Sequence, residues 1–156
     1  MFEGTANLLN FQLLPDYTRL KLDGETWLFV GGAISINRLD REPGKTWWIE
    51  EEMILDETRA QPADVLVTHT GPSWLAPPRS GMVDYYAAAE AAIGTTTLHR
   101  ELHDEAARLD RLFELVRPRQ WYFGHHHHSA THQHDGCTIR QLDMAELVRH
   151  HPAGST

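Results

Sequence analysis

The sequence is poor in cysteine and has fewer basic than acidic residues. Its 156 residues include one cysteine, Cys137, which excludes an internal disulfide framework and is compatible with a reducing compartment. Lysine and arginine total 14, aspartate and glutamate total 22, and the formal net charge is −8. This balance argues against a general nucleic-acid coat protein and against a polybasic membrane binder.

Long apolar runs are also missing. No run reaches the roughly 18 apolar residues of a transmembrane helix, so we expect no membrane association. The opening residues, MFEGTANLLNF, have neither the basic region nor the apolar run of a signal peptide, so we expect a cytoplasmic protein. The length favours one domain, and we expect residues 152–156 to form a frayed tail.

Histidine is the residue type in excess. The chain has 11 histidines, with four in a row at 125–128. A purification tag would stand at a terminus, whereas this run is internal and follows the aromatic segment WYF. We therefore treat the run as part of the fold.

Hydrophobic periodicity predicts several strands and one clear helix. The expected strands are residues 18–23, 26–30, 64–68, 120–123 and 138–142. We expect hairpins at Gly24-Glu25 and at Asp135-Gly136. Residues 98–116 have apolar positions at helical spacing and stop before a proline, while 83–93 and 144–150 are weaker helix candidates, the latter capped by Asp143. This order of elements predicts an α/β domain with a mixed sheet.

Two histidine features directly follow predicted strands. His69 follows 64–68, and His125 follows 120–123 after one glycine. A right-handed crossover through helix 98–116 would bring the carboxyl ends of both strands to one edge of the sheet. We therefore expect His69 and the cluster at 125–127 to converge. In extended backbone, His125 and His127 would point to the same side and reach two metal ions about 3.5–4 Å apart.

The other histidines are interpreted differently. We expect His126 to form a pocket wall or a hydrogen bond. His99 and His103 have the spacing of a two-histidine metal face, but charged neighbours favour a solvated helix surface. The remaining five are expected to be exposed or uninformative: His128, His132, His134, His150 and His151.

Three segments resemble the calcineurin-like metallophosphoesterases. DVLVTHTGP, at 64–72, resembles their strand–His–x–x–Pro motif, and FGHHHH, at 123–128, contains their Gly-His-x-His motif. VGGAISINRLDREPGKTWWIEEE, at 30–52, is similar to a segment of many bacterial and phage members. Within it, four residues resemble recurring positions near the active site, where we expect a structural loop: Arg38, Trp47, Trp48 and Glu50.

The resemblance implies a site and a fold. His69 and His125 match the ligands of one metal ion of a pair, and His127 matches a ligand of the other. The ions would be Mn, Fe, Zn, Ni or Mg, and the implied reaction is attack of a metal-activated hydroxide on a phosphoester. The implied fold is a sandwich of mixed β-sheets with flanking helices.

The family's earlier motifs, Asp-x-His, Gly-Asp-x-x-Asp and Gly-Asn-His, do not occur before Val30. The chain therefore resembles the C-terminal half of a metallophosphoesterase α/β/β/α fold, a single partial domain over 1–156. The missing motifs include the carboxylate that bridges two mutually repelling dications, so we expect this half to be inactive alone.

Such a half would expose strand edges and apolar faces. We therefore expect a complementary N-terminal polypeptide or a homo-oligomer as partner. The substrate would be a phosphoester, and nucleic acid enters only as a substrate. The alternatives are a non-catalytic half-domain that binds metal or protein, and a histidine-rich metal buffer.

Overall fold

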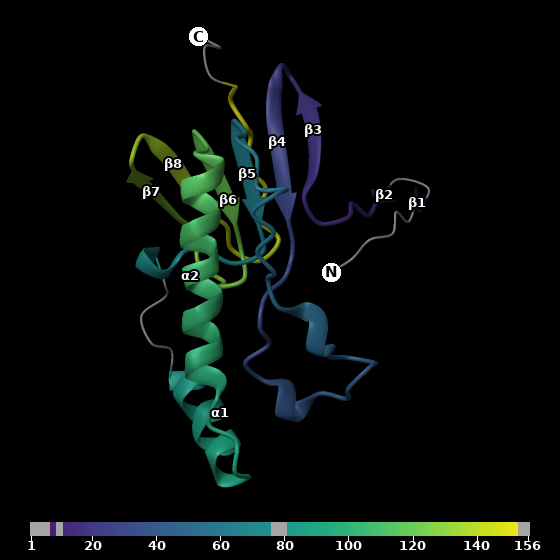
Figure 1. Ribbon diagram of the computed structural model, residues 1–156, viewed down its shortest axis with the longest axis vertical. Coiled ribbons are helices and arrows are strands. Elements are labelled where there is room, and N and C mark those ends of the chain that lie inside the picture. The colour runs from purple at the N-terminus through teal and green to yellow at the C-terminus, as the bar shows by residue number, and fades with distance from the viewer. Residues whose placement is uncertain (1–6, 9–10, 76–80, 153–156) are drawn as a thin grey trace.

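The computed structural model describes residues 7–8, 11–75 and 81–152, and Figure 1 shows how the elements are arranged. Six strands form one mixed sheet in the order β3-β4-β5-β6-β8-β7. They are β3 (Thr18–Leu22), β4 (Glu25–Val30), β5 (Val65–Thr68), β6 (Gln120–Phe123), β7 (Ala130–His134) and β8 (Cys137–Gln141). The four inner strands run parallel, and β3 and β7 pair antiparallel with them at the two edges.

Other elements lie around this sheet. The helices are α1 (Gly81–Ala92) and α2 (Leu98–Val116), and 3₁₀ turns occur at Arg38–Asp40, Ile49–Glu51 and Ser73–Leu75. Strands β1 (Asn7–Leu8) and β2 (Phe11–Gln12) form a separate two-stranded ribbon. The predicted helix 98–116 and strand 120–123 are confirmed with the same bounds. Among the described helices, none is long and apolar enough to cross a membrane.

Both β-hairpins of the six-stranded sheet turn at an Asp-Gly pair with left-handed backbone. The φ angles are 49° and 85° at Asp23-Gly24, and 46° and 76° at Asp135-Gly136. This geometry belongs to two-residue turns, which favour Asp-Gly because glycine has no Cβ to clash. The second turn is confirmed where it was expected. The first lies one residue before the expected Gly24-Glu25, because Leu22 pairs with Glu25.

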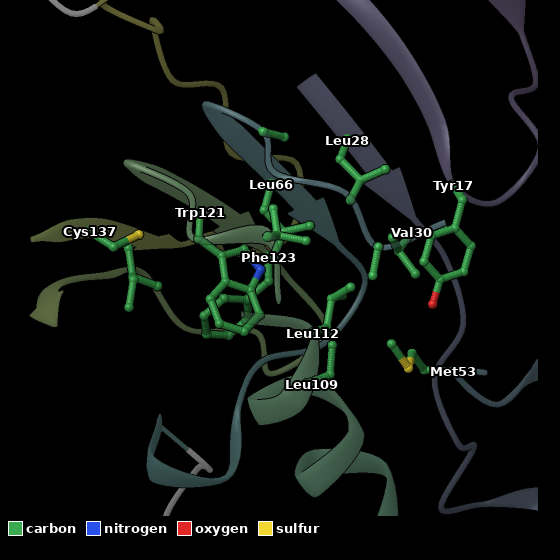
Figure 2. Close-up of a cluster of buried hydrophobic side chains, with 14 residues drawn as sticks. Tyr17, Leu28, Val30, Met53, Leu66, Leu109, Leu112, Trp121, Phe123 and Cys137 are labelled. Atoms are coloured by element: carbon green, nitrogen blue, oxygen red, sulfur yellow. The ribbon is translucent and has the colours of Figure 1, made fainter. Parts of the chain in front are cut away.

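The core lies between α2 and one face of the sheet. Leu109 and Leu112 of the helix pack against Leu28, Leu66 and Trp121 of the strands, and all five are fully buried (Figure 2). The side chains of β6 and β8 alternate between buried and partly exposed, as expected for strands with one face on the core. This packing places α2 as the crossover between parallel neighbours β5 and β6, as expected.

The expected β-sandwich does not form within the described residues. The α/β class and the mixed sheet are confirmed, but all strands from β3 to β8 belong to a single sheet. The outer face of this sheet is an aromatic row, in which Trp27 stacks on Phe29 and on Tyr122, each with ring centroids 6.1 Å apart.

The predicted C-terminal helix at 144–150 is wrong. One contact typical of a helix N-terminus is present, since the Asp143 N–H donates to the Glu146 carboxylate at 2.8 Å. Ala145 then has a φ of 55°, which an α-helix cannot contain, and the segment crosses the outer sheet face instead. His150 lies edge-on to Trp27, with ring centroids 4.6 Å apart. Of the expected frayed tail, residues 153–156 lie outside the described part.

Candidate metal-binding site

The carboxyl ends of β5 and β6 bring His69 and His125 together. The His125 Nδ1 lies 3.0 Å from the His69 Nε2, although 56 residues separate them. The register explains this proximity, since Val67 of β5 pairs with Tyr122 of β6 and both strands point the same way. The expected convergence of these two histidines is confirmed.

The turn that holds His125 has an unexpected backbone conformation. His125 and His127 have φ angles of 70° and 48°, so the predicted extended conformation of these residues is wrong. Gly124 has no positive φ, and a Cβ there would meet only ordinary contacts near 4 Å. Its role is to donate its N–H to the His69 carbonyl at 3.0 Å, which holds the two loops together.

The glycine that needs to be small is Gly71. A Cβ added there would lie 2.6 Å from the Phe123 ring, well inside contact distance. The chain after His69 therefore packs against the end of β6 at a distance that only glycine allows.

His69 and His125 favour the neutral imidazole that binds metals. Burial, and then the neighbouring histidines, lower the pKa of His125 to about 4 from an ordinary value of 6.5. Burial also lowers the pKa of His69, partly opposed by the negative charge of Glu51. Because both rings stay neutral at pH 7, each ring keeps one nitrogen whose lone pair can bind a metal.

The spacing of the two nitrogens suits a single metal ion. With metal–nitrogen bonds of about 2.0–2.1 Å, the ligating nitrogens of two imidazoles on one ion lie about 3.3–3.4 Å apart in tetrahedral geometry and about 2.8–3.0 Å apart in octahedral geometry. The observed 3.0 Å, at which the two rings also share a hydrogen bond, matches the octahedral value. His127 is exposed and lines the same cavity. Within 7–8, 11–75 and 81–152, no three His, Cys, Asp or Glu side chains converge as a metal-binding group, so the role of His127 stays a prediction.

The histidine pair opens into a cavity of about 1170 Å³. Its opposite walls come from α2 and from the loop 31–53. Five carboxylate residues line it or its rim: Asp16, Glu50, Glu51, Glu52 and Glu105. Arg41 also lines the cavity and Arg108 pairs with Glu52, but the carboxylates outnumber these cations and favour a cation in the cavity.

Carboxylates on the cavity wall also hold the loop 31–53. Glu105 of α2 is buried and accepts the N–H of Ile34 at 3.2 Å and that of Met53 at 2.9 Å. Burial raises the pKa of Glu105, although both hydrogen bonds oppose this shift. Glu51 accepts the Ser35 N–H at 3.1 Å. The loop therefore has a defined path beside the histidine pair.

Arg38, within the same loop, ties it to both helices. Its guanidinium binds the carboxylates of Glu90 on α1 and Glu101 on α2, each with a nitrogen–oxygen contact of 2.5 Å. These contacts raise the pKa of Arg38 further above its already high value. They agree with the structural role expected for this loop.

Sequence reasoning missed the residues that support the histidine loops. Thr68 and Thr70 flank His69, are buried, and are linked by a 2.6 Å hydrogen bond from the Thr68 hydroxyl to the Thr70 carbonyl. Trp121 donates its indole N–H to the Thr68 hydroxyl at 2.8 Å. The signal that the sequence offered for these supporting residues was the presence of polar threonines at the end of an apolar strand.

Some of the other histidines make contacts that the sequence did not predict. His126 forms a hydrogen bond to Thr70, as expected for a pocket-wall residue. His134 stacks on Trp74 with ring centroids 3.9 Å apart, and His150 packs on the sheet, so neither is a free surface residue. His99 and His103 keep exposed side chains on α2, although both line the cavity rim.

In comparisons with known proteins, no family model, curated protein or solved structure matches this chain.

Proposed function

We propose that this chain carries the two-histidine part of a metal-dependent phosphoesterase site, with His69 and His125 binding one divalent ion. The observation that supports this most is the 3.0 Å separation of their ring nitrogens at the ends of two parallel strands. A bound divalent ion would lower the pKa of a coordinated water and neutralise phosphate oxygens. Mn, Fe, Zn, Ni and Mg are the candidate ions.

Two neutral imidazoles form an incomplete site for this chemistry. They cannot offset the repulsion between two dications, which requires anionic ligands close by. The described residues supply no third converging ligand. We therefore propose that the remaining ligands come from a complementary segment carrying the family's Asp and Asn-His motifs, and that this chain alone does not hydrolyse phosphoesters.

Metal titration followed by calorimetry tests the site. The chain should bind Zn²⁺ or Ni²⁺ at about one ion per molecule, and His69→Ala and His125→Ala should each abolish this binding. His128→Ala is the matched control, because this residue belongs to the same run but does not line the cavity. Unchanged binding in both site variants would show that the assignment is wrong.

Hydrolysis of bis-p-nitrophenyl phosphate with Mn²⁺ tests the activity. The chain alone should be inactive, and adding a polypeptide with the missing motifs should produce activity that depends on His69 and His125. Full activity of the chain by itself would contradict the half-site proposal. Persistent inactivity of the pair, with intact metal binding, would favour the non-catalytic alternative.

The alternative is a half-domain that binds metal or protein without catalysis. Exposed apolar side chains on the loop 31–53 favour a protein partner, since Trp48 is 50% exposed and Ile49 is 73% exposed. The partner would be the complementary N-terminal half or a second copy of the chain. Sedimentation of the chain alone and with the complementary half distinguishes these two partners.

A further inference from the structure

The loops that carry His69 and His125 are joined by a second side-chain contact beneath the histidine pair. The Thr70 hydroxyl oxygen lies 3.3 Å from the His126 Nε2. We propose that Thr70 and His126 are a positioning pair, which holds His69 and His125 at the separation that one metal ion requires. This inference rests on the proposed metal-binding role of the two histidines.

Thr70 is held in place from the core of the sheet. The indole N–H of Trp121 donates to the Thr68 hydroxyl at 2.8 Å, and that hydroxyl donates to the Thr70 carbonyl at 2.6 Å. Thr68 and Thr70 are 7% and 6% exposed. Hydrogen bonds in such a buried setting are strong and leave few alternative arrangements, so the backbone that carries the Thr70 hydroxyl has a defined position.

His126 is held from the other loop. Its N–H donates to the Gly124 carbonyl at 2.8 Å, and its ring lies edge-on to Phe123 with centroids 5.9 Å apart. The residues before and after it, His125 and His127, both have left-handed backbone. Such conformations are costly for residues other than glycine and persist only where surrounding contacts enforce them.

The Thr70–His126 contact therefore joins a rigid loop to a strained one. His125 has a φ of 70° and its Nδ1 faces His69, and the next residue in the chain is His126. Because the Nε2 of His126 is turned to Thr70, this ring positions the site without being a ligand itself. Residues that orient metal ligands typically change metal affinity by about 10–100-fold when they are replaced.

Zn²⁺ titration of the whole chain tests the pair. Thr70→Val removes the hydroxyl at nearly constant shape, and His126→Phe keeps the ring against Phe123 while removing its nitrogens. Each should weaken Zn²⁺ binding about 10-fold, and the double variant should be no weaker than either single variant. Thr70→Ser should restore wild-type affinity, and His128→Phe is the control for adding a phenyl ring to this run.

The affinities are compared at a temperature where denaturation shows each variant to be folded. A general loss of stability would lower the melting temperature without weakening Zn²⁺ binding by the folded chain. Wild-type affinity in both Thr70→Val and His126→Phe would overturn the proposal, as would additive losses in the double variant.

Histidine ¹⁵N spectra of the metal-free chain separate this inference from the proposed function. Absence of Zn²⁺ binding in the wild type would refute the metal site but leave the pair measurable. A single His126 tautomer in the wild type that becomes a mixture in Thr70→Val would support the contact. The same tautomer mixture in both proteins would overturn it.

Discussion

Arg38 and Glu90 form a two-bond ion pair between chain positions 52 residues apart, with nitrogen–oxygen distances of 2.5 and 2.9 Å. The Glu90 side chain is 2% exposed, so its carboxylate depends on this guanidinium in place of water. The pair joins the loop beside the histidine site to helix α1.

Replacing Arg38 should therefore be strongly destabilising. Arg38→Ala leaves the buried Glu90 charge uncompensated, and we expect a loss of about 3–5 kcal/mol in the free energy of unfolding. Denaturant titration measures this loss. Lys45→Ala is the control, because its ion pair with Glu42 is exposed and should contribute less than about 1 kcal/mol. Equal effects of the two substitutions would contradict the structural role of Arg38.

Acidification should destabilise the chain through its histidine turn. The pKa of both His125 and His126 is lowered to about 4 by burial, and secondarily by neighbouring histidines, against 6.5 for a free imidazole. Between pH 6.5 and 4 the unfolded chain therefore binds protons that the folded chain does not, so stability falls as the pH falls through this window. Above pH 6.5 both states are neutral at these residues and the contribution is complete.

Denaturant titrations at pH 7.5, 6 and 5 without metal test this dependence. His125→Gln removes one of the two groups, so its stability should fall less steeply over this range than that of the wild type. Parallel curves for the two proteins would show that His125 does not resist protonation in the folded state.

Gly71 should tolerate no side chain. Gly71→Ala places a Cβ 2.6 Å from the Phe123 ring, and we expect a loss of about 1–3 kcal/mol from the resulting overpacking. The Zn²⁺ affinity should fall as well, because Gly71 lies two residues after His69 and a shift of the chain there would move the His69 ring. Gly81→Ala is the matched control, since its Cβ would meet nothing within 4 Å, and it should be neutral or slightly stabilising. If Gly71→Ala were as neutral as the control, the close approach to Phe123 would be wrong.

His150 should contribute to stability although it lies near the end of the chain. Its ring nitrogens lie 2.5 Å from the Glu25 carboxylate and 3.0 Å from the Tyr122 hydroxyl. We expect His150→Ala to lower the free energy of unfolding by about 1–3 kcal/mol, because the buried carboxylate of Glu25 loses one of its hydrogen-bond partners.

Thermal and denaturant unfolding of His150→Ala and His151→Ala measure this difference. His151 is exposed and contributes its backbone carbonyl, to which Gln120 donates, so its side chain should be dispensable. Similar stability losses in both variants would mean that the C-terminal segment is not held by the His150 side chain.

The local pattern of the sequence was sufficient for the helix 98–116 and the strand 120–123. Apolar residues at helical spacing, a proline stop and an aromatic strand are all signals within one element, and they gave the observed bounds. The convergence of His69 and His125 was also predictable. It follows from two parallel strands with a helical crossover, a topology that constrains where strand ends lie.

Residues 144–150 show where local signals were insufficient. The Glu146 carboxylate accepts the Asp143 backbone N–H, a contact typical of a helix N-terminus, but His150 contacts partners on the sheet that only the folded chain presents. Those contacts draw the segment across the outer sheet face, so tertiary packing overrides a weak helix propensity.

The same distinction between local pattern and tertiary packing applies to the candidate metal-binding site. The sequence by itself determined that imidazoles stand at the ends of two strands, because strand positions follow from side-chain patterns along the chain. The tertiary structure alone decided the left-handed turn at His125 and His127, the Thr70–His126 contact and the separation of the two ring nitrogens. These depend on burial and hydrogen bonds between residues distant in the chain, which no local pattern specifies.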